Sequence, residues 1–198
     1  IVITGGLGYI GTELCKIYSG FSWNHKITVI DNRFISERVN QLRNWNMDFV
    51  HGDILDKNLI YKYCHDADIV HHLAGITDVP RVKSESSINH DKKIKSVAEE
   101  GTQNILDSIT NKCKIIMPSS HVVFEGMKNV KNDIAENEET CPVLSYGMSK
   151  DFNEKQLKSS GKNYIILRLG SVYGYSTDTA RIDIMPNFFS KMASQNGT

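Results

Sequence analysis

The sequence predicts an α/β protein built on a doubly wound parallel sheet, and two observations support this fold class. Short apolar runs alternate along the chain with longer segments of helical periodicity. The runs are rich in β-branched residues and bounded by turn residues, which is typical of strands buried on both faces. Strands separated by helices imply right-handed crossovers between parallel strands.

The predicted elements follow one another in strict alternation. Strands are predicted at residues 1–3, 26–30, 47–52, 67–74, 113–119 and 163–169. Helices are predicted at residues 9–19, 36–44, 57–64, 88–110 and 144–160. The polar stretch at 128–141 is predicted to be an exposed loop, and turn residues after Ser171 precede a last helix. We therefore expect a sheet domain at 1–170 and the incomplete beginning of a second subdomain at 171–198.

Charge and composition exclude two classes of partner. Lys plus Arg and Asp plus Glu both number 23, so the net charge is zero. A nonspecific nucleic-acid binder normally carries a basic excess, so we expect no nucleic-acid partner. The sequence contains no apolar run as long as a membrane span, so we expect no membrane partner and no signal peptide.

The four cysteines, Cys15, Cys64, Cys113 and Cys141, lie far apart without a CxxC pair. This spacing disfavours structural zinc and a disulfide framework, and it is typical of buried thiols in a reducing compartment. We therefore expect a cytoplasmic protein.

Gly5, Gly8 and Gly11 have the spacing G-x-x-G-x-x-G between the first predicted strand and the first predicted helix. In this position Gly5 permits a tight turn, Gly8 lets a pyrophosphate approach the backbone, and Gly11 lets the helix pack closely on the strand. The phosphates would meet the free N–H groups and the positive end of the helix dipole. The pattern predicts a Rossmann-type dinucleotide site.

Asp31 ends the second predicted strand, 20 residues after Gly11. An acidic side chain there accepts hydrogen bonds from the adenosine ribose and repels a 2′-phosphate, which favours NAD over NADP. We assign Asp31 and the adjacent Asn32 to the cofactor site. The alternative is that Asp31 caps a turn, and Arg33 nearby weakens the discrimination against NADP.

Two further strand ends are predicted to reach the cofactor. Asp53 follows the third strand, where it would accept a hydrogen bond from the adenine amino group while Ile54 packs against the ring. The alternative for Asp53 is a cap of the following helix. Ala74 and Gly75 end the fourth strand, and their small size would let the chain pass close to the cofactor.

The candidate catalytic residues are Ser120, Tyr146 and Lys150. Tyr146 and Lys150 are four residues apart on a predicted helix, so they share one face. An ammonium beside a phenol favours the phenolate, so Tyr146 is predicted to be a general base. Ser120 follows a buried strand, where doubly wound folds gather their sites, and its hydroxyl can bridge the substrate oxygen and the tyrosine.

These segments together resemble the extended short-chain dehydrogenase/reductase family, in its NAD-dependent epimerase/dehydratase branch that acts on nucleotide sugars. The resemblance rests on "TGGLGYIG", "VIDN", "GDILD", "HHLAG", "EGTQNIL", "SSHVVFEG", "YGMSK" and "LRLGSVYG", which follow the family's order. It implies NAD as cofactor, a nucleotide-sugar substrate and a homodimer formed through the long helix at 88–110 and the helix at 144–160.

The resemblance also implies a role for individual positions. Tyr9 and Ile10 would contact the pyrophosphate, residues 73–77 would line the middle of the cofactor, and Gly170 and Ser171 would contact nicotinamide and substrate. The expected cofactor-binding residues are Gly5, Gly8, Tyr9, Ile10, Gly11, Asp31, Asn32, Asp53, Ile54, Leu73, Ala74, Gly75, Tyr146, Lys150 and Gly170. The expected substrate-binding residues are Thr77, Ser120, His121, Tyr146 and Ser171.

The reaction that the resemblance implies is epimerisation. Tyr146 takes a proton from a sugar hydroxyl while the attached carbon gives hydride to NAD, and a keto sugar remains. The ketone turns over, and the hydride returns to its other face.

Departures from the family pattern define the alternatives. Family dehydratases carry Asp-Glu directly after the catalytic hydroxyl, where this chain has His121 and Val122, and this argues against a dehydratase. His121 is expected to be either an acid or, more in keeping with a strand end, a hydrogen-bonded structural residue. The "VVFEG" segment resembles keto-sugar reductases, which consume reduced cofactor. Ala98 and Ser171 replace family asparagines, which leaves a non-catalytic NAD-binding protein as a third hypothesis.

His65, His71 and His72 are close in the sequence, but adjacent residues of a strand point to opposite faces. We therefore predict no metal site.

Overall fold

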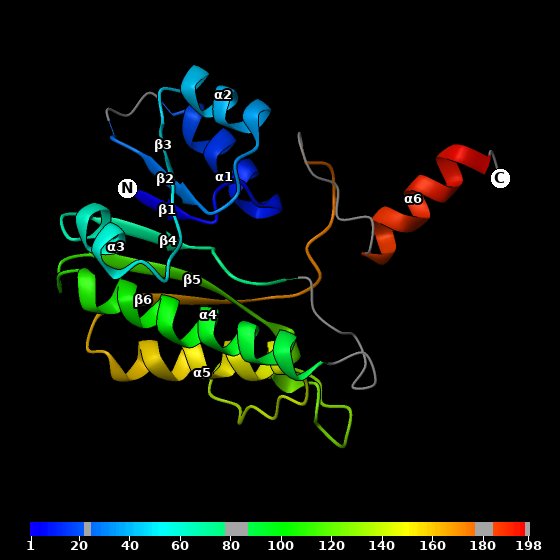
Figure 1. Cartoon of the computed structure of the whole chain (residues 1–198). Helices are drawn as coiled ribbons and strands as arrows, with labels where there is room; N and C mark the ends of the chain where they lie inside the picture. Colours follow the sequence, from blue (N-terminus) through cyan, green and yellow to red (C-terminus); the bar gives the residue numbers. More distant parts are fainter. Residues whose placement is uncertain (22–24, 78–86, 177–183, 197–198) are drawn as a thin grey trace.

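The computed structural model describes residues 1–21, 25–77, 87–176 and 184–196 (Figure 1). Its strands are β1 (Val2–Thr4), β2 (Thr28–Asp31), β3 (Asp48–His51), β4 (Ile69–His72), β5 (Lys114–Ser120) and β6 (Asn163–Leu169). Its helices are α1 (Tyr9–Ser19), α2 (Ser36–Asn44), α3 (Lys57–Cys64), α4 (Ile88–Ser108), α5 (Ser145–Ser159), α6 (Met185–Asn196) and the short 3-10 helix η2 (His121–Phe124). Every predicted strand and helix is present, with ends within two residues of the prediction.

The six strands form one parallel sheet in the order β3-β2-β1-β4-β5-β6. Helices α1 and α2 cover one face, and α3, α4 and α5 cover the other (Figure 1). The strand order reverses between β1 and β4, and ligands of doubly wound folds bind outside the carboxyl ends of the strands at this point. The predicted fold class is confirmed.

Successive residues of a strand point to opposite faces, so each face of the sheet has its own hydrophobic cluster. The two clusters hold the helices against the sheet. Val2 of β1 belongs to the cluster under α3, α4 and α5, together with Ile115 and Leu157. Its neighbour Ile3 belongs to the cluster under α1 and α2, together with Val39.

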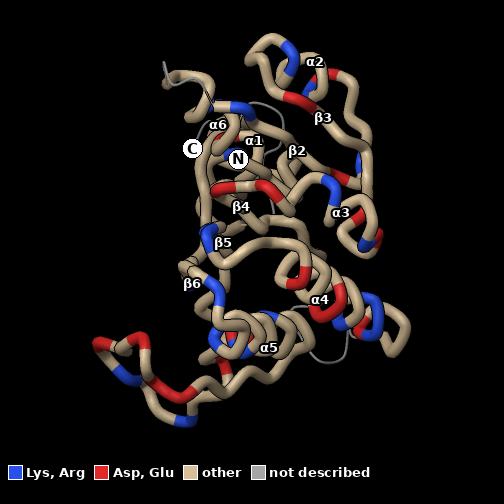
Figure 2. The backbone as a smooth tube through the Cα atoms, turned by 90° about the vertical axis from the view of Figure 1, so that its left-hand side faces the viewer, with Lys and Arg blue, Asp and Glu red and all other residues tan. Residues whose placement is uncertain are grey.

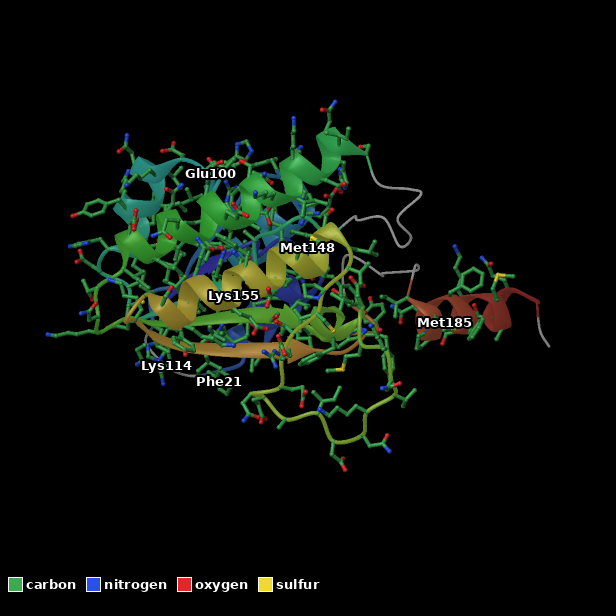
Figure 3. The ribbon with its side chains drawn as sticks, turned by 90° about the horizontal axis from the view of Figure 1, so that it is seen from below. Phe21, Glu100, Lys114, Met148, Lys155 and Met185 are labelled. Atoms are coloured by element: carbon green, nitrogen blue, oxygen red, sulfur yellow. The ribbon has the colours of Figure 1, made fainter. Side chains whose placement is uncertain are left out.

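Helices α4 and α5 lie side by side on their face of the sheet, where Figure 3 labels Glu100 and Lys155. Their backbones are joined by side-chain amides. Asn153 donates to the carbonyl oxygen of Ala98 at 2.9 Å, and Gln156 donates to that of Glu99 at 3.0 Å. These bonds place α5 firmly along α4 and leave its first turn at the carboxyl edge of the sheet.

One expectation about β6 is wrong: this strand is not buried on both faces. Tyr164, Ile165 and Leu167 are exposed, with relative accessibilities of 37%, 39% and 45%. β6 is the edge of the sheet, and within the described residues no helix packs on its face opposite α5.

The remaining bulk expectations concern charge and thiols. In the view of Figure 2, acidic and basic residues alternate along the helices and the loop before α5.

All four cysteines are free, and three of them are buried. Burial raises the pKa of Cys15 and Cys64 to about 12. None of the described helices combines the length and apolar composition needed to cross a membrane.

Candidate active site

The glycine loop connects β1 to α1 at the carboxyl edge of the sheet. Gly5 has φ +69, and a Cβ there would lie 2.6 Å from the backbone nitrogen of Ala74. A Cβ at Gly11 would lie 2.6 Å from the Gly5 carbonyl oxygen and from Cα of Gly6. Gly5 therefore makes the tight turn as predicted, whereas Gly11 packs the helix against the loop itself rather than against a strand.

The peptide of Leu7, in the middle of this loop, is held from both sides. Its N–H donates to Oδ2 of Asp31 at 3.0 Å, and its carbonyl oxygen accepts from the guanidinium of Arg38. Both side chains are buried, Asp31 at the end of β2 and Arg38 in α2. These two bonds fix the orientation of the Leu7 peptide within the loop.

The same carboxylate also bonds its own strand end. Oδ1 of Asp31 accepts from the Arg33 N–H at 3.0 Å and from Nε of Arg33 at 3.4 Å. The turn-capping alternative for Asp31 is therefore present in the structure. A carboxylate oxygen can accept more than one hydrogen bond, so a ribose hydroxyl can still be accommodated.

The first turn of α1 forms a cradle for an anion. Gly8 is its N-cap and supplies no side-chain hydrogen bond, and Thr12 is the first residue whose N–H pairs inside the helix, with Gly8 at 2.9 Å. The N–H groups of Tyr9 and Ile10 therefore point outward. A Cβ at Gly8 would meet only the Gly5 oxygen at 3.1 Å and Nη2 of Arg33 at 3.7 Å. The free donors, the helix dipole and the guanidinium fit a pyrophosphate.

Asp53 and Ile54, the two residues predicted around adenine, differ in burial. Asp53 is half-buried and accepts from Nδ2 of the exposed Asn32 at 3.1 Å and from the Leu55 N–H at 3.0 Å. The helix-cap alternative for Asp53 is wrong, because Asp56 caps α3 through the N–H groups of residues 58 and 59. Ile54 is 5% exposed and would collide with a Cβ at Gly101, so its side chain belongs to the core.

His72 ends β4 beneath the loop and is fully enclosed. Its Nδ1 lies 3.0 Å from the Thr4 hydroxyl and its Nε2 lies 3.0 Å from the Thr102 hydroxyl, while Thr4 also accepts from the Ala74 N–H at 3.3 Å. Burial, with a smaller contribution from the charge of Lys150, lowers the pKa of His72 to about 3. His72 is therefore a neutral bridge from β1 through β4 to α4.

His71 points the other way, as predicted, and its Nε2 lies 2.7 Å from the hydroxyl of Tyr18 in α1. Among the described residues no three His, Cys, Asp or Glu side chains lie together as metal ligands.

Lys150 joins α5 to the end of β5. Its ammonium donates to the carbonyl oxygen of Pro118 at 3.0 Å and lies 5.6 Å from the centre of the Tyr146 ring. Burial of the ammonium lowers the pKa of Lys150 to about 8. The spacing seen in the sequence therefore does place the lysine beside the tyrosine.

Ser120 is the last residue of β5, two residues after Pro118. It is 8% exposed, and its Oγ accepts from the Val122 N–H at 3.4 Å, which starts η2. A Cβ at Gly147 would lie 3.0 Å from the Val122 oxygen, so the glycine lets α5 approach η2 closely without crowding. Gly147 thus brings Tyr146, its neighbour, to the turn that carries Ser120.

Glu125 sets the start of α5. Its Oε1 accepts from the N–H groups of Val143 at 2.9 Å and Leu144 at 2.6 Å, directly before the helix begins. A carboxylate near this end of the helix complements the helix dipole. The glutamate of "VVFEG" therefore positions the helix that carries Tyr146.

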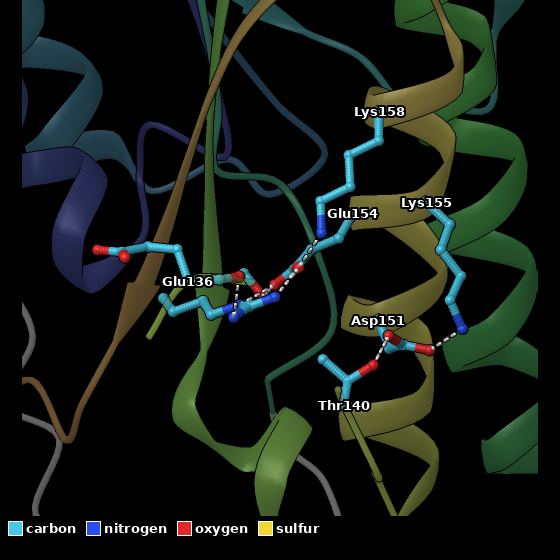
Figure 4. Close-up of polar contacts among 8 residues, drawn as sticks. Glu136, Thr140, Asp151, Glu154, Lys155 and Lys158 are labelled. Carbon is cyan, nitrogen blue, oxygen red and sulfur yellow. Dashed lines mark hydrogen bonds and ion pairs between the residues drawn. The ribbon is translucent and has the colours of Figure 1, made fainter. Parts of the chain in front are cut away.

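The buried carboxylate of Glu154 in α5 holds the carboxyl ends of β5 and β6 (Figure 4). Glu154 of α5 is 1% exposed and accepts from Ser119 at 2.6 Å and from Arg168 at 2.9 and 2.7 Å. Burial by itself raises the pKa of Glu154, but these hydrogen bonds and the one from Lys158 hold that pKa below its ordinary value. Arg168 also donates to the Glu136 carbonyl oxygen at 3.0 Å, and its ion-pair partner is the carboxylate of Glu154 in α5.

The remaining predicted residues lie at the same edge of the sheet. His121 is exposed and its Nδ1 lies 3.2 Å from the Leu169 carbonyl oxygen, which is the structural alternative for this residue. Leu73 and Ala74 are partly buried in the two clusters. Gly75, Thr77, Gly170 and Ser171 are exposed, and apart from the chain neighbours no atom of the described residues lies within 4 Å of a Cβ placed at Gly75 or Gly170.

Sequence reasoning missed Thr4, Thr102, Arg38, Glu125 and Glu154. Their partners lie far away in the sequence, at separations of 30 residues for His72 and Thr102 and 35 for Ser119 and Glu154. The pattern of glycines, acids and the Tyr–Lys pair contains no trace of such contacts.

The chain is similar to known proteins over most of its length. The model of the 3-beta hydroxysteroid dehydrogenase/isomerase family matches residues 2–180. The CDP-paratose 2-epimerase of Salmonella typhi is 28% identical over 88% of this chain and 57% of that protein. The dTDP-D-glucose 4,6-dehydratase of Dictyostelium discoideum is 29% identical over 88% of this chain and 44% of that protein.

Among solved structures, the UDP-glucose 4-epimerase of Brucella ovis in complex with NAD superposes with a TM-score of 0.70. It is 28% identical, over 92% of this chain and 53% of that chain. The chain therefore spans about half the length of the relatives that it matches.

Proposed function

The chain belongs to the 3-beta hydroxysteroid dehydrogenase/isomerase family, and from this premise we propose that it is an NAD-dependent epimerase of a nucleotide-activated sugar. The substrate class comes from relatives such as the CDP-paratose 2-epimerase and the UDP-glucose 4-epimerase. One observation carries the proposal: the ammonium of Lys150 lies beside Tyr146 and bonds Pro118, at the end of the strand that bears Ser120.

NAD fits the residues present. The outward N–H groups of Tyr9 and Ile10 and the open space at Gly8 would hold its pyrophosphate. Asp31 would hold the adenosine ribose, with Asn32 and Asp53 at the adenine end. When bound, NAD supplies a hydride acceptor that later returns the hydride.

The protein's own residues then move one proton and orient one substrate oxygen. Tyr146 takes the proton from the sugar hydroxyl, and Lys150 stabilises the phenolate with a charge that Pro118 holds in place. Ser120 orients the substrate oxygen, and Thr77, His121 and Ser171 lie along the same edge to contact the sugar. The same groups act in reverse once the keto sugar has presented its other face.

A 4,6-dehydratase is disfavoured, because elimination of water needs an acid and a base after Ser120. His121 bonds the Leu169 carbonyl oxygen and Val122 is apolar. The keto-sugar reductase remains the second candidate, motivated by "VVFEG". Glu125 of that segment holds the backbone directly before α5, a role that serves an epimerase equally.

The test is proton NMR of the purified protein with catalytic NAD and a panel of UDP-, dTDP- and GDP-sugars. We expect a C4 or C2 epimer to appear without net formation of NADH. Tyr146→Phe should abolish the conversion while NAD still binds. Full activity in Tyr146→Phe would remove the proposal, and stoichiometric loss of reduced cofactor with keto sugars would establish the reductase.

We further propose a cytoplasmic homodimer formed through α4 and α5. The outer surface of α5 exposes Met148 and Phe152, which are 53% and 40% accessible and one helical turn apart. Light scattering of Met148→Glu should show a monomer where the unchanged protein gives a dimer, and a monomer in both would contradict the proposal.

A further inference from the structure

Three residues from distant parts of the chain form a closed set of hydrogen bonds at the start of α1. The hydroxyl of Tyr9 donates to the Gly174 carbonyl oxygen. The Gly174 N–H donates to Oδ1 of Asn187 at 2.9 Å, and Nδ2 of Asn187 lies 3.5 Å from the Tyr9 hydroxyl. Tyr9 is 165 residues from Gly174 and 178 residues from Asn187, so the set joins the first helix to the last.

The backbone at Gly174 is shaped for this contact. Its φ is +124, a conformation that glycine adopts readily and other residues rarely do. This turn uses both polar groups of the same residue, the carbonyl for Tyr9 and the N–H for Asn187. Asn187 lies in the first turn of α6 and is half-buried.

The set joins the proposed pyrophosphate cradle to the segment that follows β6. Tyr9 is the first residue of α1, and its N–H belongs to the pyrophosphate cradle. The segment that ends at Gly174 begins after β6 with Gly170 and Ser171, at the proposed nicotinamide end. In Figure 1 this segment leaves β6 and runs past the carboxyl ends of the strands toward α1.

We propose that the Tyr9 side chain is a latch that holds the segment after β6 across the bound dinucleotide and slows its release. The inference rests on the proposed function. It assigns a task to the hydroxyl, which a phenylalanine ring of the same shape could not perform. A reaction that takes hydride from the substrate and returns it needs the cofactor and the keto sugar to stay together, and the latch would serve this need.

Stopped-flow fluorescence of bound NADH, chased with excess NAD, tests the latch. Tyr9→Phe and Asn187→Ala should each release NADH about tenfold faster, the effect of losing one net hydrogen bond or two weak ones. The double variant should be little faster than either alone, because both remove the same set. Tyr175→Phe is the matched control, since Tyr175 is in the same segment and 82% exposed, and it should release NADH at the original rate.

A second measurement needs no cofactor. Amide hydrogen exchange at Gly174 should accelerate about tenfold in Tyr9→Phe, because the N–H donates to the asparagine that the latch orients. Equal melting temperatures would show that the fold is intact.

The outcomes separate this inference from its premise. If the unchanged protein binds no NADH, the dinucleotide site itself is wrong and the latch with it. If NADH binds but both release and Gly174 exchange are unaltered in Tyr9→Phe, the site stands and the latch is refuted.

Discussion

The ammonium of Lys150 donates a 3.0 Å hydrogen bond to the carbonyl oxygen of Pro118. This bond joins the helix that carries Tyr146 to the strand that carries Ser120, since Pro118 lies two residues before the serine. The lysine therefore has two tasks in the proposed reaction. It supplies a positive charge beside the phenol, and it fixes the distance between helix and strand.

Lys150→Met keeps much of the side-chain volume and removes the charge. Turnover should fall at least about a hundredfold, because the phenolate loses its cation. In the unchanged protein, turnover should decline above about pH 8, where Lys150 loses its proton. Initial rates across the pH range measure both effects.

Lys155→Met is the control for this variant, because Lys155 is on the same helix and its side chain is 68% exposed. It should keep the original rate and the original alkaline limb. Unimpaired turnover in Lys150→Met would contradict the assigned role.

Gly5→Ala should destabilise the fold by at least about 2 kcal/mol, since a Cβ there meets backbone and the residue has a positive φ. Gly20→Ala should change stability little, because its nearest atom, the Ile17 oxygen, would lie at 3.4 Å. Urea unfolding of both variants measures the difference. Equal midpoints would show that the loop can move away from Ala74.

Glu154→Gln should cost about 3 kcal/mol, because Arg168 is then left without a charged partner in a buried setting. Adding Arg168→Met should recover part of this loss. Glu100→Gln, on the exposed surface of α4, should be neutral. Urea unfolding again gives the values, and a loss no larger than that of Glu100→Gln would disprove the prediction.

His72 makes stability depend on acid. Its pKa is about 3 in the folded chain and 6.5 ordinarily, so between these values the unfolded chain binds the extra proton. Stability should therefore fall as pH drops from 6.5 toward 3, by up to about 1.4 kcal/mol per pH unit. His72→Gln should flatten this slope, whereas His51→Gln, at an exposed position, should not. Equal slopes in the unchanged protein and His72→Gln would rule out His72 as the cause.

Local patterns predicted the helices well. The predicted helices at 9–19, 36–44 and 57–64 coincide with α1, α2 and α3, because periodicity and turn residues act within a few positions of the chain. The glycine spacing likewise predicted the turn at Gly5, and the i, i+4 spacing placed Lys150 beside Tyr146.

Other features of the site were decided only when distant segments met. The sheet order makes β6 an exposed edge, although its composition resembles that of a central strand. The side chain of Ile54, which we predicted to pack against the adenine ring, is buried against Gly101 instead.

The sequence by itself therefore determined the fold class, the family resemblance and the candidate residues, since each depends on residue types at short spacing. Only the tertiary structure decided which carboxylate holds Leu7, which hydroxyls enclose His72 and which helix Tyr9 reaches. Such partners are chosen by the packing of whole elements, and the free energy of a buried polar contact depends on where the rest of the chain lies.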